Sequence, residues 1–126
     1  MKKEVFAAAD SAPPVGPYSA AVGAGDYVFV SGQIALDADG KIAGYTPKEQ
    51  ARKALQNLSA TLAAAGLTTA NVVKTTIFLS DMDEFAAVNE VYGEFFSEPY
   101  PARSTVQVAR LPKDLHVEIE AIAWRG

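Results

Sequence analysis

An arginine, a hydroxyl group and two carboxylates stand at strand-like spacing near the end of the 126-residue sequence. Residues 104–109 and 115–124 alternate as β-strands do, and a Leu-Pro-Lys-Asp turn between them predicts a hairpin. Successive side chains of a strand point to opposite faces, so Glu118 and Glu120 share one face. Arg103 likewise shares a face with the threonine two residues later. A cation, a hydroxyl and carboxylates on one hairpin surface would form a site for a small anion. The alternative is a cross-strand ion pair on a hydrated surface.

The last predicted strand has one apolar face and one mixed face. The apolar face holds Leu115, Val117, Ile119, Ala121 and Ala123, and the mixed face holds His116, Glu118, Glu120, Ile122 and Trp124. Two carboxylates on one strand face repel each other, and in a dry setting they would need cations or protons. We interpret His116 as a histidine on the strand surface rather than as a catalytic group.

Composition excludes several classes of function. With 49% hydrophobic residues in 126, the chain is expected to form one domain with a substantial core. A net charge of −4 argues against nucleic acid as the main partner, and the absence of cysteine excludes disulfides and thiolate chemistry. A single histidine argues against zinc, and no acidic calcium-loop motif is present, so we expect no metal, although a carboxylate site for magnesium or calcium stays open. No apolar run approaches the ~18 residues that span a bilayer, which predicts a soluble cytoplasmic protein.

Alternation and helical spacing predict the elements that would carry these residues. Thr46, Pro47 and Glu49 form a helix start, with a capping threonine, a first-turn proline and a capping-box glutamate. This helix would end at Gly66, and a second helix would open at Asp81. Strands are expected at residues 1–9, 18–22, 27–31, 71–80, 104–109 and 115–124.

The order of these elements predicts an α/β fold, an α+β sandwich with a mixed sheet of five or six strands and two helices on one face. The second face would carry aromatic side chains that have no internal partner, namely Tyr27, Phe29, Phe78 and Trp124. We therefore expect a homo-oligomer that packs these faces together; the alternative is a half-solvated sheet with scattered aromatics. Gly32, at the end of the third strand, would allow a bulge or the close approach of another group.

Several short motifs, in their order and spacing, carry a specific resemblance that covers the whole chain. They are Gly16-Pro17-Tyr18-Ser19, Ser31-Gly32-Gln33-Ile34, Ala64-Ala65-Gly66-Leu67, Val88-Asn89-Glu90-Val91-Tyr92, Pro101-Ala102-Arg103-Ser104-Thr105-Val106, Ala109-Arg110-Leu111-Pro112-Lys113-Asp114 and Val117-Glu118-Ile119-Glu120-Ala121. Together they closely resemble the signature of the RidA (YjgF) family, the reactive intermediate deaminases.

This resemblance implies a single RidA-like domain over residues 1–126, with a chorismate-mutase-like fold. It also implies a homotrimer with sites in the clefts between subunits. The implied activity is the hydrolysis of 2-imino or 2-enamino acids, such as 2-aminoacrylate, 2-iminopropanoate and 2-iminobutanoate, to 2-keto acids and ammonia. The resemblance implies no cofactor, and we expect no nucleic-acid or membrane partner.

The resemblance also implies roles for individual residues. Arg103 matches the arginine that holds the substrate carboxylate, and a planar guanidinium can do so through two hydrogen bonds. Glu118 matches the glutamate that orients and deprotonates the attacking water. Tyr18, Ser31 and Asn89 match pocket positions that would bind substrate or water. Their structural alternatives are loop packing, a strand-end cap and an exposed helix residue, respectively.

The sequence departs from the family pattern at one position. Many close members carry cysteine two residues after the arginine, where this chain has Thr105. A hydroxyl there can bind substrate but is a poor nucleophile without an adjacent base, so thiol-dependent redox switching is not expected. Glu120 is the second candidate for the base, although the spacing from Arg103 fits the family at Glu118.

Two other classes of function stay open at this point. A non-catalytic module that binds or senses small carboxylates or keto acids would keep Arg103 and lack turnover. Ribonuclease or chaperone-like behaviour, reported for the family, would need features that the acidic charge and single histidine do not favour.

Overall fold

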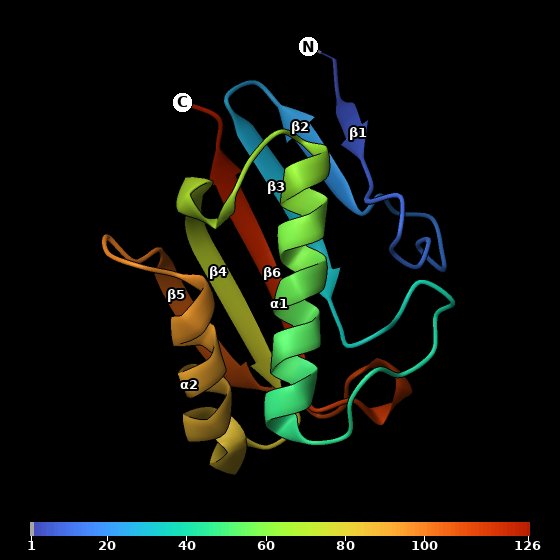
Figure 1. Ribbon diagram of the computed structural model, residues 1–126, viewed down its shortest axis with the longest axis vertical. Coiled ribbons are helices and arrows are strands. Elements are labelled where there is room, and N and C mark those ends of the chain that lie inside the picture. Colours follow the sequence, from blue (N-terminus) through green and yellow to red (C-terminus); the bar gives the residue numbers. More distant parts are fainter. Residues whose placement is uncertain (1) are drawn as a thin grey trace.

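A mixed six-stranded sheet backs two helices in the computed structural model, which describes residues 2–126 (Figure 1). The strands are β1 (Glu4–Phe6), β2 (Ala21–Ala24), β3 (Tyr27–Gln33), β4 (Val72–Leu79), β5 (Ala102–Gln107) and β6 (Val117–Trp124). Their order across the sheet is β1-β2-β3-β6-β4-β5, and only β4 and β5 run parallel. The predicted mixed sheet is therefore confirmed.

Helix α1 (Pro47–Ala64) begins where the sequence predicts it, because its first turn satisfies its own backbone donors. The Thr46 hydroxyl accepts a hydrogen bond from the Glu49 amide at 3.1 Å, and the Glu49 carboxylate accepts one from the Thr46 amide at 3.0 Å. Helix α2 (Phe85–Phe95) starts later than predicted. Residues 82–84 form a short 3-10 turn that Asp81 caps through the amide of Asp83 at 2.9 Å.

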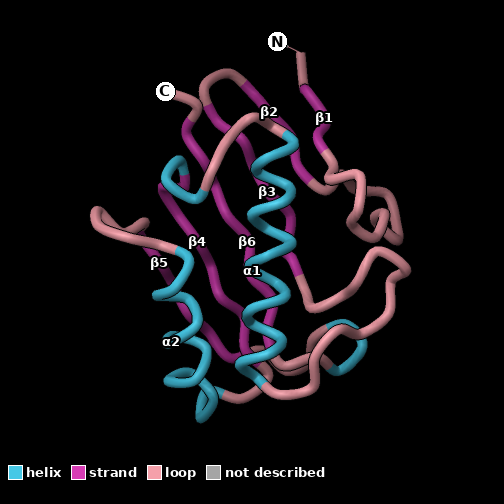
Figure 2. The backbone as a smooth tube through the Cα atoms, viewed as in Figure 1, coloured by secondary structure: helices cyan, strands magenta, loops and turns pink. Residues whose placement is uncertain are grey.

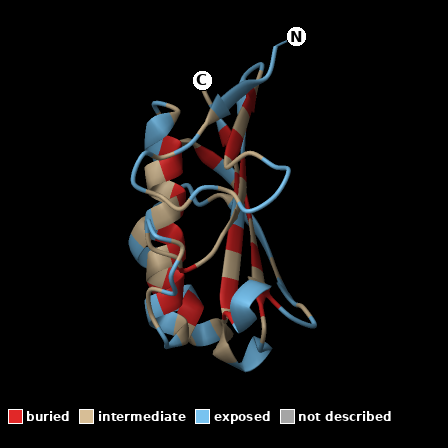
Figure 3. Ribbon diagram, turned by 90° about the vertical axis from the view of Figure 1, so that its right-hand side faces the viewer, coloured by how far each residue is buried: buried red, intermediate tan, exposed pale blue. Residues whose placement is uncertain are grey.

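Both helices lie on the same face of the sheet, and the core fills the space between the two layers (Figures 2 and 3). Leu55, Leu58 and Leu62 of α1 are fully buried, as are Val88 and Val91 of α2. The odd-numbered residues of β6, from Val117 to Ala123, face this core and are buried. None of the helices in residues 2–126 combines the length and apolar character that crossing a bilayer requires.

No helix of residues 2–126 covers the opposite face of the sheet, which we call the open face (Figure 3). It carries Tyr27, Phe29, Phe78, Val106, Glu118, Glu120, Ile122 and Trp124. Tyr27 lies opposite Trp124, and the side chains of Tyr27, Phe29 and Trp124 remain 45%, 47% and 49% exposed. The expectation that the helices cover one face only is confirmed, and the aromatic side chains lie on the other.

The predicted hairpin of the last two strands is wrong. Strand β4 lies between β5 and β6, so that β5 pairs in parallel with β4 and β6 pairs antiparallel to it. Helix α2 is the crossover that joins the parallel strands β4 and β5, which leaves β5 at the sheet edge. The turn at Pro112–Asp114 belongs instead to a longer connection that passes the width of β4. Alternation gives the faces of a strand but does not identify its neighbour.

Candidate functional site

Arg103 lies on the helix-covered face at the edge of the sheet, where three residues of α2 hold its guanidinium. Nη1 donates a hydrogen bond to Asn89 Oδ1 at 2.7 Å. The guanidinium carbon lies 4.8 Å from the ring centroid of Tyr92 and 5.4 Å from that of Phe85, within cation–π range. Among the ion pairs of residues 2–126, none involves Arg103. Its positive charge is therefore held in place without a carboxylate partner from the described part of the chain.

A cavity of about 430 Å³, the arginine pocket, opens over this guanidinium. Its lining consists of Asn89, Tyr92, Gly93, Tyr100, Pro101 and Arg103. Phe85, Asn89 and Tyr92 are spaced i, i+4 and i+7, which places them on one face of α2. That spacing is the sequence signal that places the two supporting rings beside Asn89, and neither ring was among the predicted site residues.

Glu118 lies half-buried on the open face of β6, and the backbone of β3 approaches it closely. The register of β3 against β6 shifts between Val30 and Gln33, which confirms the predicted irregularity at Gly32. A Cβ atom at Gly32 would lie 2.6 Å from the carboxyl carbon of Glu118. Only glycine leaves room for the carboxyl group there. Burial raises the pKa of Glu118, and the nearby charge of Glu120 raises it further.

A second cavity, of about 980 Å³, contains Glu118 and is called the glutamate cavity. Residues of the N-terminal loop line it together with Tyr18, Gly32, Asn57 and Lys113. The Tyr18 side chain is 53% exposed at this cavity, so its hydroxyl can reach a bound molecule. The sequence-predicted Tyr18 and Glu118 are therefore brought together on one cavity.

Ser31 and Thr105 are placed differently from Tyr18. The Ser31 hydroxyl donates to the Ser19 carbonyl at 2.6 Å, and the Ser31 amide donates to the Ala20 carbonyl at 2.9 Å. These bonds tie the segment that carries Tyr18 to the end of β3. Thr105 is half-buried in β5, two residues beyond Arg103 and on the same face.

Arg103 and Glu118 do not meet within one chain. Arg103 lies opposite Thr75, and Thr75 lies opposite Ala121, so β5 and β6 are two strand spacings apart, about 10 Å. Glu118 lies a further three residues along β6, about 10 Å, and on the other face of the sheet. The predicted meeting of the cation and carboxylates on one hairpin surface is therefore wrong, because β4 separates the strands and the two side chains face opposite ways.

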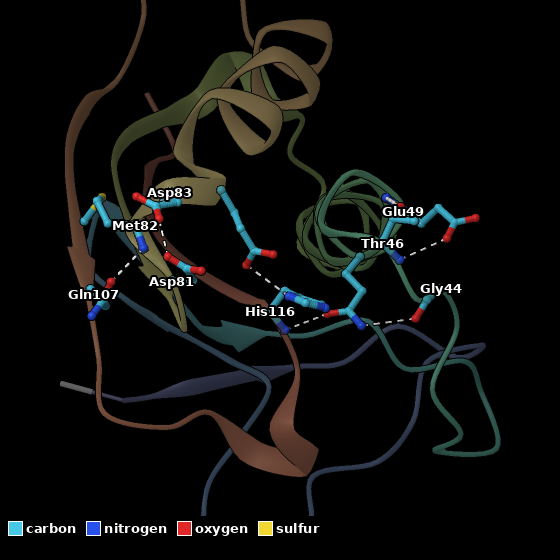
Figure 4. A network of polar contacts seen from close by, with 10 residues as sticks. Gly44, Thr46, Glu49, Asp81, Met82, Asp83, Gln107 and His116 are labelled. Carbon is cyan, nitrogen blue, oxygen red and sulfur yellow. Dashed lines mark hydrogen bonds and ion pairs between the residues drawn. The ribbon is translucent and has the colours of Figure 1, made fainter.

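His116 also departs from its predicted face. It falls one residue before β6, and its Nδ1 lies 3.0 Å from Glu84 Oε1 at the start of α2 (Figure 4). Its backbone amide donates to Gln50 Oε1 at 2.7 Å, and Gln50 in turn donates to the Gly44 carbonyl at 3.1 Å. His116 thus joins the starts of the two helices instead of lying beside Glu118. Within residues 2–126, no three histidine, aspartate or glutamate side chains are grouped closely enough to hold a metal ion.

Comparison with known proteins places this arrangement in context. Residues 9–125 match the family model described as Endoribonuclease L-PSP. The RutC family protein PH0854 of Pyrococcus horikoshii is 48% identical over 124 residues, with 98% of both chains covered. The protein of Escherichia coli K12 named "Putative reactive intermediate deaminase TdcF" is 47% identical over 115 residues, with 89% of both chains covered.

Solved structures agree with the sequence matches. The crystal structure of Escherichia coli TdcF with bound serine superposes with a TM-score of 0.91 at 44% identity, covering 98% of this chain and 99% of that one. RidA from a Psychrobacter species superposes with a TM-score of 0.91 at 40% identity over 96% of this chain and 98% of that one. These likenesses confirm the chorismate-mutase-like α+β fold. The chain therefore belongs to the RidA/YjgF family, whose family model bears the name Endoribonuclease L-PSP.

Proposed function

We propose that the protein hydrolyses small reactive 2-imino and 2-enamino acids, such as 2-iminopropanoate and 2-aminoacrylate, to 2-keto acids and ammonia without a cofactor. The observation that carries this proposal is the Arg103 guanidinium, which Asn89 and two aromatic rings hold at a cavity while no carboxylate among residues 2–126 pairs with it. A relative named as a deaminase at 47% identity adds support.

The chemistry that the residues can perform is a water addition to a C=N bond. The Arg103 fork would accept the substrate carboxylate, which fixes the orientation of the imine carbon. Glu118 would take a proton from water as the water oxygen bonds to that carbon, and would pass this proton to the imine nitrogen, which gives a carbinolamine. The carbinolamine hydroxyl would then lose its proton to the nitrogen through the same carboxylate as the C–N bond breaks, which releases ammonia and leaves the 2-keto acid. A raised pKa makes the Glu118 carboxylate a stronger base than an ordinary glutamate.

Both residues can act on one substrate only if two chains contribute, since they lie on opposite faces of the sheet. We therefore propose a homotrimer in which Arg103 of one subunit meets Glu118 of its neighbour. The exposed aromatic side chains of the open face support this assembly, because apolar patches of this kind mark contact surfaces. A ring of three subunits repeats one heterologous contact and closes on itself. Tyr18, Ser31, Asn89 and Thr105 would complete the substrate-binding surface around these two groups.

A non-catalytic binding module is the second candidate, because the TdcF structure holds serine. RNA cleavage, which the family model's name suggests, is less well supported. The chain has a net charge of −4, which does not favour binding to a phosphate backbone. Its single histidine contacts Glu84.

The test generates 2-iminopropanoate in situ from serine and a serine dehydratase, and follows the loss of the imine. The wild-type protein should accelerate this loss, whereas Arg103→Ala and Glu118→Gln should not. Arg52→Ala is the matched control, because Arg52 pairs with Glu94 on the outer helix surface and belongs to neither cavity. Binding of pyruvate without any acceleration by the wild type would favour the binding module and overturn the enzyme.

A further inference from the structure

We propose that Tyr92, held in place by Thr75, is a positioning residue that fixes the Arg103 guanidinium for carboxylate recognition. This inference rests on the proposed function, because it assigns Arg103 a carboxylate to bind. Tyr92 would act through Arg103, and the part of it that matters would be the face of its ring.

The ring of Tyr92 lies between the core and the guanidinium. The guanidinium carbon of Arg103 is 4.8 Å from the ring centroid on one side. The ring of Phe96, which is buried, packs beside it with a centroid separation of 4.5 Å. Arg103 itself belongs to an exposed edge strand, where a long side chain without such support would sample many rotamers.

Thr75 fixes the other end of the ring. Its hydroxyl lies 2.7 Å from the Tyr92 hydroxyl, and Thr75 is fully buried in β4 directly opposite Arg103. A buried hydroxyl pair of this kind holds its geometry, because breaking it strands a polar group away from water. Burial raises the pKa of the Tyr92 phenol, despite the opposing effects of Thr75 and the Arg103 charge, so the ring stays neutral under the cation.

The consequence is a guanidinium whose plane is set before any ligand arrives. Asn89 Oδ1 accepts a hydrogen bond from Arg103 Nη1, and the ring face of Tyr92 restricts the tilt of the guanidinium plane. Because the Arg103 side chain is already ordered on folding, the loss of its conformational entropy does not have to occur when the ligand binds. The loss of the ring should therefore weaken carboxylate binding in the ground state and the transition state equally, which raises KM and leaves kcat unchanged.

The experiment compares five variants with the wild type in the in situ 2-iminopropanoate assay. Tyr92→Leu should raise KM roughly three- to thirty-fold, the range expected for one cation–π contact, with kcat within about twofold. Tyr92→Phe keeps the ring face and should restore KM to within about twofold. Thr75→Val should raise KM because the stranded Tyr92 hydroxyl displaces the ring, and the double variant Thr75→Val/Tyr92→Phe should reverse that rise. Arg52→Ala is the control, since Arg52 pairs with Glu94 and lines neither cavity, and it should leave KM unchanged.

A second readout does not depend on turnover. The order parameter of the Arg103 Nε–H bond, measured by 15N relaxation, should approach the ~0.85 of rigid groups in the wild type and fall below ~0.6 in Tyr92→Leu. If Arg103→Ala abolishes turnover while Tyr92→Leu and Thr75→Val leave KM unchanged, the positioning role is overturned and the deaminase stands. If the wild type shows no turnover, the deaminase fails, and the Nε order parameter alone decides the positioning role. Should Tyr92→Leu not fold, Thr75→Val and its double variant provide the same comparison.

Discussion

Gly32 and Glu118 are so close that a methyl group on residue 32 would lie 2.6 Å from the Glu118 carboxyl carbon. This contact joins a bulge in β3 to the candidate base on β6. A substitution at Gly32 therefore tests whether the position of the Glu118 carboxyl group matters for the reaction.

Gly32→Ala should displace the Glu118 carboxyl group, because the nearest atoms belong to the Glu118 side chain itself. We expect kcat to fall at least about tenfold because the base is misplaced. The free energy of unfolding should change little, because the displaced atoms lie at the far end of a flexible side chain. Steady-state kinetics and denaturant unfolding measure the two effects. Unchanged kcat would show that the Glu118 position is irrelevant to the reaction.

Mixing two inactive variants should restore activity, because Arg103 and Glu118 lie on opposite faces of one chain. Arg103→Ala and Glu118→Gln subunits, denatured and refolded together in equal amounts, should give about a quarter of wild-type activity, since a quarter of the contacts in a closed ring pair the two intact residues. Each variant refolded alone is the control. If the mixture stays inactive while the wild type refolds to full activity, the two residues do not act across a subunit contact.

Activity and stability should depend on pH in opposite directions through Glu118. Its pKa is raised above the ordinary value of 4.5 by burial and by Glu120, so the folded chain keeps this proton to higher pH than the unfolded chain. This proton stabilises the folded chain fully at a pH below the pKa that Glu118 has in the unfolded chain. The stabilisation is lost as the pH rises through the pKa that Glu118 has in the folded chain. The deprotonated base appears over the same interval, so kcat/KM should rise there while stability declines.

Two variants check this dependence. The stability of Glu118→Gln should not decline as the pH rises. Its unfolding midpoint should therefore match that of the wild type at acid pH and exceed it at neutral pH. Glu120→Gln removes the like charge and should move the acid limb of the kcat/KM profile to lower pH. An acid limb that stays in place in Glu120→Gln would contradict the assignment of Glu118 as the titrating base.

Gly93→Ala should stabilise the protein by about 0.5–1 kcal/mol, because glycine within a helix costs that much relative to alanine. Gly93 is an exposed residue of α2, and a Cβ atom there would meet nothing within 4 Å beyond the adjacent backbone of its own helix, among residues 2–126. Chemical denaturation of the variant measures the gain. A loss of stability instead would indicate that another subunit occupies the space beside this residue.

Local sequence patterns predicted the helices and strands well, but they did not predict which strands pair with each other. The capping box of Thr46 and Glu49 located the start of α1, because a helix start is decided within four residues. Alternation gave the faces of β6 correctly from Val117 to Trp124. It could not show that β4 would insert between β5 and β6, because that choice depends on the crossover through α2. The support of Arg103 by Tyr92 was missed for a related reason, since an apolar helix stripe reads as core whether or not a cation lies over it.

The two-sided placement of Arg103 and Glu118 has a consequence for how the protein behaves at low abundance. A single chain would carry both reactive groups and still be inactive, because Glu118 could not reach the substrate bound at Arg103 of the same chain. Under the proposed assembly, catalytic output per molecule would drop steeply on dilution below the dissociation constant of the trimer, so that the total rate would rise more than linearly with protein concentration.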